Sequence, residues 1–174
     1  MRRVLVIGCP GAGKSTLTRA LAETLGLPAV YLDRLWWKSG WINRTRAEVD
    51  ARLDAALAGD AWVMGGNYLR TLPRRLEWCD AVLFLDYPRR LCLFRALRRI
   101  LRWRGRTRPD MAEGCPERLD PAFIRWIWAF HRTQRPRVLE LLDGWKGEAP
   151  TSRSPAQCAA FLAQQTHHTT PGTA

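Results

Sequence analysis

The sequence has few cysteines, no long hydrophobic run and no visible export signal. Its five cysteines form no Cys-x-x-Cys pair, which argues against a disulfide framework or a thiolate zinc site and is typical of a reducing cytoplasm. The longest apolar stretches are about five residues, as at 81–85, whereas a transmembrane helix needs about 20. Two arginines follow Met1 and lead into a strand-like run that is too short for a signal-peptide core. We therefore expect a cytoplasmic protein that contacts no membrane.

Acidic residues are scarce, and one long segment has none. The 174 residues include 28 Lys and Arg against 16 Asp and Glu, for a net charge of +12, and only three of the basic residues are lysines. Nine arginines lie between Arg89 and Arg108 with no acid among them. A genomic preference for Arg codons explains part of the excess but not the clustering. The block predicts an anionic partner, whether phosphate, nucleic acid or an acidic surface.

Length and patterning predict a single α/β domain over 1–165, followed by a disordered tail at 166–174. Apolar runs typical of buried strands lie at 4–7, 29–32, 62–64 and 81–85. Helical spacing alternates with them at 15–25, 45–58, 89–103 and from 121 onward, where Pro136 should split the last helix. Strands that alternate with helices indicate a mainly parallel sheet.

Helix ends and faces give further expectations. Thr45 and Glu48 have the spacing of a capping box, and Asp120 precedes Pro121 as an N-cap precedes a first-turn proline. In helix 89–103 the arginines gather on one face. We expect the opposite, apolar face to dock on the core through Leu93, Leu97, Ile100 and Leu101.

Residues 8–15 satisfy the phosphate-loop pattern G-x-x-x-x-G-K-[ST] between a predicted strand and a predicted helix. Its glycines allow consecutive backbone N–H groups to point at a phosphate, and the helix N-terminus adds its dipole. Lys14 would reach the β- and γ-phosphates, and the Ser15 hydroxyl would hold Mg²⁺. We therefore predict that the chain binds ATP with Mg²⁺ through Gly8, Pro10, Gly11, Ala12, Gly13, Lys14, Ser15 and Thr16.

A series of further motifs follows the phosphate loop in order. They are Tyr31-Leu32-Asp33, Trp36-Trp37-Lys38-Ser39-Gly40-Trp41, Gly66-Asn67-Tyr68, Leu85-Asp86-Tyr87-Pro88-Arg89 and residues 104–111. Over roughly 1–145 the chain resembles the bacterial DNA topology modulation protein family of adenylate-kinase-like P-loop proteins. The resemblance implies the three-layer P-loop fold of nucleoside and nucleotide kinases. It also implies an acceptor flap at about 33–60 and an arginine-rich lid at about 95–135.

Two departures from that family affect the site. The position of the usual Walker B acid, before the Gly-Asn-Tyr motif, is occupied by Gly65. The segment expected to carry a fifth strand, 148–154, has almost no apolar residues, so the sequence leaves that strand open.

Candidate acceptor and metal residues lie at the predicted carboxyl ends of the strands, where open parallel sheets bind ligands. Asp33 could bind Mg²⁺ or accept a hydroxyl proton; helix capping or a salt bridge with Arg34 is the structural alternative. Asp86 competes for the metal, although a pairing with Arg89 is the simpler interpretation. Acceptor contacts are expected from Trp37, Gly66, Asn67 and Arg70, although the flap tryptophans fit packing and Arg70 fits a solvent-exposed position as well.

In the lid, Arg98, Arg102 and Arg106 are the leading candidates for phosphate contact, with Arg132 and Arg135 next. Lys14, Asp33 and these three lid arginines would form the catalytic set of an ATP-dependent phosphotransferase. Two alternatives stay open: a nucleic-acid-binding regulator that uses ATP as a switch, and a polynucleotide kinase. The acceptor is not identified, and the chain fits a monomer or a homodimer.

Overall fold

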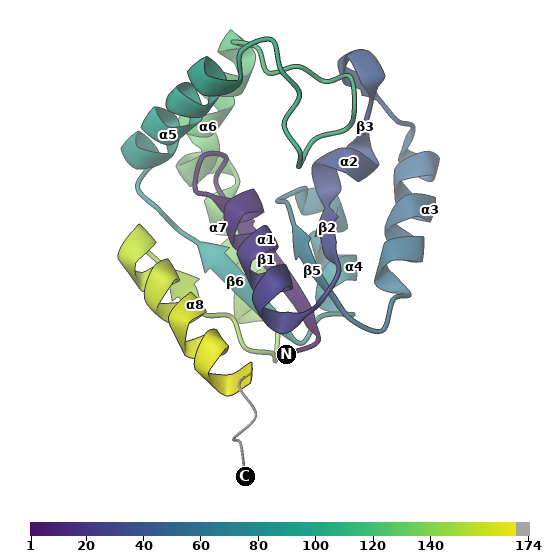
Figure 1. Ribbon diagram of the computed structural model, residues 1–174, viewed down its shortest axis with the longest axis vertical. Helices are drawn as coiled ribbons and strands as arrows, with labels where there is room; N and C mark the ends of the chain where they lie inside the picture. The colour runs from purple at the N-terminus through teal and green to yellow at the C-terminus, as the bar shows by residue number, and fades with distance from the viewer. Residues whose placement is uncertain (170–174) are drawn as a thin grey trace.

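A computed structural model describes residues 1–169, in which a parallel five-stranded sheet lies between two layers of helices (Figure 1). The strand order is β2-β5-β1-β6-β7, and every pairing in the sheet is parallel. The strands are β1 (Arg3–Gly8), β2 (Ala29–Tyr31), β5 (Trp62–Gly65), β6 (Ala81–Leu85) and β7 (Thr151–Ser152). No helix of this described part is long and apolar enough to cross a bilayer.

Alternation along β1 divides the core into two clusters. Val4 and Val6 face one cluster, whereas Leu5 and Ile7 face the other. The first cluster is covered by α1 (Lys14–Leu25), α5 (Arg89–Trp103), α6 (Pro121–Thr133) and α8 (Pro155–Thr169). Helices α3 (Arg46–Leu57), α4 (Leu72–Leu76) and α7 (Arg135–Asp143) cover the second, together with the short helix α2 (Leu32–Trp36).

Several sequence predictions of local structure are confirmed. Thr45 and Glu48 form the capping box of α3, and the Asp120 carboxylate accepts from the backbone N–H of Ala122 at 2.8 Å. The predicted helix after Pro121 is divided into α6 and α7 just before Pro136. A fifth strand does form: β7 is only two residues long, but the carbonyls of Glu148, Pro150 and Ser152 extend the pairing by accepting from the backbone N–H groups of Val82, Phe84 and Asp86. Strand β7 is therefore held in the sheet by backbone hydrogen bonds, although its segment has almost no apolar side chains.

The predicted docking face of α5 is confirmed for Ile100, which is buried, and for Leu93, which packs against the first core cluster, but it is wrong for Leu97 and Leu101. Cys92, Ala96 and Ile100 are buried, whereas Leu97 is exposed and Leu101 is 73% exposed. The reason is steric, because the phosphate loop packs directly against α5 and only small residues fit in that contact. A Cβ at Gly11 would lie 2.1 Å from the Cys92 carbonyl oxygen and 3.2 Å from the Ala96 Cβ.

Two further expectations need correction. The tail predicted from Thr166 is helical through Thr169, at the end of α8; residues 170–174 lie outside the described part. β2 ends at Tyr31, one residue earlier than the predicted strand, so Asp33 lies in the first turn of α2.

Candidate functional site

The phosphate loop connects β1 to α1 as the sequence predicts. Gly8, Gly11 and Gly13 have φ of 144°, 85° and 100°, a region that side chains rarely adopt. The loop closes on itself through the Ala12 N–H, which donates to the Cys9 carbonyl at 3.1 Å. The first turn of α1 then places its free N–H groups at the mouth of the loop, where an anion is stabilised.

Lys14 spans the loop from the start of α1. Its Nζ donates to the carbonyl oxygens of Gly8 at 2.9 Å and Cys9 at 3.1 Å. Burial lowers the pKa of Lys14, the negative charge of Asp33 acts in the opposite direction, and the nearby charge of Arg99 lowers the pKa further.

The missing Walker B acid has a steric explanation at Gly65. A Cβ at this position would lie 2.3 Å from Oγ1 of Thr18 and 3.3 Å from its Cβ. Thr18, on α1, is fully buried, so it cannot move aside freely. Helix α1 thus occupies the space into which a longer side chain at the end of β5 would extend.

Asp33 and Asp86 were the candidate carboxylates, and the structure distinguishes them. Asp86 is bound by Arg135, whose Nε and Nη2 donate to its two carboxylate oxygens, both at 2.7 Å. The expected structural pairing is thus confirmed, but the partner is Arg135 rather than Arg89. Because this pair engages both oxygens of Asp86, it also occupies one of the arginines considered for phosphate contact. Asp33 accepts one hydrogen bond, from the Tyr68 hydroxyl at 2.5 Å.

The lid arginines divide into two groups. Arg98, Arg102 and Arg106 are exposed, so their predicted contact with phosphate stays a prediction. Arg95 is half-buried, and its Nη2 lies 3.8 Å from where a Cβ would stand at Gly13 of the phosphate loop. Arg99 donates to Glu117 at 3.1 Å and lies within electrostatic reach of Lys14.

Sequence reasoning placed Arg95 and Arg99 on the arginine face but did not select them. The sequence signal that could have selected them is the pair of small residues Cys92 and Ala96. These residues mark the face of α5 that packs closest to the loop. One helical turn links Arg95 to Arg99, so both extend along the same side.

A hairpin within the predicted acceptor flap lies between α2 and α3. It consists of β3 (Trp37–Lys38), the turn η1 (Ser39–Trp41) and β4 (Ile42–Asn43). The loop after α5 reaches this hairpin (Figure 1): Gly40 N–H donates to the Gly114 carbonyl at 2.8 Å, and the Trp41 indole donates to the Pro116 carbonyl at 2.9 Å. Trp37 packs edge-on against Trp41 with ring centroids 5.3 Å apart. The flap and the lid loop are therefore joined in this structure.

The other predicted acceptor residues lie on the turn between β5 and the short helix η2 (Leu69–Thr71). Gly66 has φ of 145°, and a Cβ there would collide with Leu32 at 2.7 Å. Asn67 is buried, and its Oδ1 has no hydrogen-bond partner among the described residues. Arg70 forms a two-bond pair with Asp50 at 2.7 and 3.1 Å, so it is not a free anion clamp in this structure.

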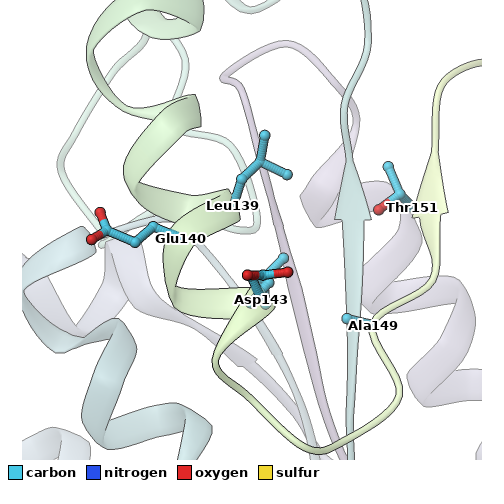
Figure 2. A pocket seen from close by; sticks show the side chains of 6 residues that line it. Leu139, Glu140, Asp143, Ala149 and Thr151 are labelled. Carbon is cyan, nitrogen blue, oxygen red and sulfur yellow. The ribbon is translucent and has the colours of Figure 1, made fainter.

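An open hollow lies elsewhere, between α7 and the β7 edge of the sheet, with a volume of about 450 Å³ (Figure 2). It is lined by Leu139, Glu140, Leu142, Asp143, Ala149 and Thr151. Its two charged side chains are acidic, which disfavours phosphate. The nucleotide site is therefore assigned from the loop geometry and not from this hollow.

Comparisons with known proteins agree with that geometry. A model of the ATPase family associated with various cellular activities (AAA) matches residues 4–86, from β1 to just past β6. No curated protein matches the sequence.

Solved kinases have the same fold. A shikimate kinase from Acinetobacter baumannii, in complex with shikimate, is 17% identical with a TM-score of 0.58, over 98% of this chain and 96% of that one. A gluconokinase from Sinorhizobium meliloti 1021 is 17% identical with a TM-score of 0.53, over 96% and 94%. A shikimate kinase from Bacteroides thetaiotaomicron is 17% identical with a TM-score of 0.56, over 96% and 97%. The chain therefore has the fold of the small P-loop kinases.

Proposed function

We propose that the protein is an ATP-dependent phosphotransferase of the nucleoside and nucleotide kinase type, acting on a small-molecule acceptor. The observation that carries the proposal is the position of Lys14 in a glycine-rich strand-to-helix loop, where its Nζ donates to the carbonyls of Gly8 and Cys9. The kinase fold of the structural neighbours supports it. The resemblance to the DNA topology modulation family stays a prediction, since the matching family model is a different one.

The residues present fit Mg²⁺ as well as ATP. Ser15 and Asp33 offer hydroxyl and carboxylate oxygens, the hard ligands that Mg²⁺ prefers, and Mg²⁺ when bound neutralises phosphate charge. Among the described residues, no group of three or more His, Cys, Asp and Glu side chains could hold a metal alone. The phosphates of the nucleotide would therefore complete the ligand set.

The chain's own side chains would then have separate tasks. Lys14 would stabilise the negative charge of the γ-phosphoryl group from the loop side, and Arg95 would do so from α5. Arg99 would have to leave its pair with Glu117 to join them. Arg98, Arg102 and Arg106 would join them through movement of the lid. Asp33, held by Tyr68 through one oxygen, offers the other to Mg²⁺ or to the hydroxyl proton of the acceptor.

Binding of a fluorescent ATP analogue to two lysine variants tests the proposal. Lys14→Ala should lose binding and ATP turnover while its circular dichroism is unchanged. Lys146→Ala, which removes an exposed lysine far along the chain, should behave as the unmodified protein. Equal affinity and turnover in all three proteins would refute the phosphate-loop assignment.

A further inference from the structure

Arg75 is a fully buried arginine on α4 that has no carboxylate partner among the described residues. Its guanidinium donates only to backbone carbonyls: those of Thr71 at 3.3 Å, Gly66 at 3.1 Å, Asn67 at 2.6 Å and Tyr68 at 3.1 Å. Burial lowers the pKa of Arg75 to about 9, because the guanidinium loses its hydration there. Arginine is almost never fully buried unless it is paired, so this position calls for a specific reason.

The carbonyl groups that accept hydrogen bonds from Arg75 belong to the turn after β5. Three of them come from Gly66, Asn67 and Tyr68 in succession, so the turn is fixed residue by residue. Tyr68 has φ of 24° and ψ of 76°, a conformation that a bulky residue adopts only where its surroundings enforce it. Arg75 contributes to that enforcement through the carbonyl of the strained residue itself, which also accepts from the Thr71 N–H at 3.0 Å and the Thr71 hydroxyl at 3.1 Å.

The strained turn directs the Tyr68 side chain at Asp33. The Tyr68 ring packs on Trp36 with centroids 4.9 Å apart, and its hydroxyl donates to Oδ1 of Asp33 at 2.5 Å. Burial raises the pKa of Tyr68, and the charge of Asp33 raises it further, so the hydroxyl keeps its proton and remains a donor. A short bond from a hydroxyl to a carboxylate is of the strong, charge-assisted kind.

We propose that Arg75 and Tyr68 are positioning residues, in which the buried guanidinium holds a strained turn so that the Tyr68 hydroxyl fixes one oxygen of Asp33 and leaves the other for the reaction. The proposal rests on the proposed function, because it gives Asp33 its orientation toward metal or acceptor. The proposal also gives a role to Tyr68, which belongs to the Gly-Asn-Tyr motif but was not among the predicted site residues. Tyr68 from the turn and Lys14 from α1 are the groups that interact with Asp33.

Proton NMR of the full-length protein tests the geometry without nucleotide. A short hydroxyl–carboxylate bond should give a slowly exchanging hydroxyl proton resonance downfield of the amides. We expect this resonance in the unmodified protein and in the control Tyr31→Phe. It should be absent from Tyr68→Phe and Asp33→Asn. In Arg75→Lys, which keeps the charge but loses the fork of donors, it should be weakened or lost, whereas Arg74→Lys on the exposed side of α4 should keep it.

Steady-state ATP hydrolysis supplies the functional readout. Tyr68→Phe should lower kcat at least about tenfold with the KM for ATP unchanged, because one orienting bond to a charged group is lost while the loop is intact. A combined Tyr68→Phe/Arg75→Lys variant should lose no more kcat than Tyr68→Phe alone, since both changes act through one bond. If Arg75→Lys does not fold, Arg75→Gln, which retains amide donors for the same carbonyls, takes its place in the cycle.

A resonance that survives in Tyr68→Phe would overturn the proposal, as would one unaffected by Arg75 replacement in a folded variant. A kcat that falls additively in the combined variant would also overturn it, by showing that Arg75 acts elsewhere. Failure of the proposed function has a different signature: no variant, and not the unmodified protein either, would turn over ATP, while the downfield resonance would remain.

Discussion

A side chain at Gly65 should destabilise the protein, and Thr18 should be the cause. Gly65 has an ordinary strand conformation, so backbone strain does not oppose a substitution; the obstacle is Oγ1 of Thr18, 2.3 Å from the position of a new Cβ. Forcing atoms into a packed core costs about 1 to 3 kcal/mol. For a domain of this size each kcal/mol lowers Tm by about 2 to 4 °C, so Gly65→Ala should lower Tm by about 2 to 12 °C.

The variant that combines Gly65→Ala with Thr18→Ala tests whether Thr18 causes the loss of stability. Thr18→Ala removes the clashing hydroxyl, which has no hydrogen-bond partner among the described residues, so by itself it should change Tm little. Combined with Gly65→Ala it should recover most of the lost stability, although the Cβ of residue 18 would still lie about 3.3 Å from the new Cβ. Thermal melts of the four proteins give the coupling free energy. Unchanged Tm in Gly65→Ala, or strictly additive effects, would refute the steric account of the missing Walker B acid.

Three further predictions concern the site. Asp33→Asn should raise the Mg²⁺ requirement or cut the turnover rate by about 10²-fold, measured by ADP release across a Mg²⁺ titration; an unchanged titration would remove Asp33 from the mechanism. Arg95→Gln should weaken binding of the ATP analogue about tenfold or more, while Arg98→Gln should change it little; the reverse order would favour the exposed arginines. Trypsin cleavage at 104–108 should slow when ATP and Mg²⁺ are added, whereas a segment bound to DNA would instead show duplex affinity that falls steeply with salt.

The sequence allowed the phosphate loop to be predicted because its chemistry is local. Residues 8–15 carry the glycines, the lysine and the hydroxyl in one stretch, and the flanking apolar run and helix ends are local patterns too. Lys14 and Gly65 could both be assigned before the fold was known. Why Gly65 is glycine could not, since Thr18 meets it only in the folded chain.

The residues that orient the site required the structure. The rotation of α5, which selects Arg95 over Arg98, depends on how closely the loop approaches Cys92, a long-range contact that forms only in the folded chain. Arg75 resembles its exposed neighbour Arg74 in sequence, and arginine is rarely buried, so nothing in the pattern marked it. Strand β2 was predicted one residue too long, and the partner of the Asp33 carboxylate could not be predicted because Tyr68 lies 35 positions away in the sequence.

The central claim is phosphoryl transfer, and acceptor-dependent ADP release tests it most directly. Nucleosides, nucleotides, sugars and oligonucleotides would be screened with ATP and Mg²⁺, with ³¹P NMR to identify the phosphorylated product. The account predicts that a small hydroxyl-bearing compound increases ADP release and gains a phosphate, and that Lys14→Ala abolishes both effects. ADP release that no acceptor stimulates, or that persists in Lys14→Ala, would contradict it.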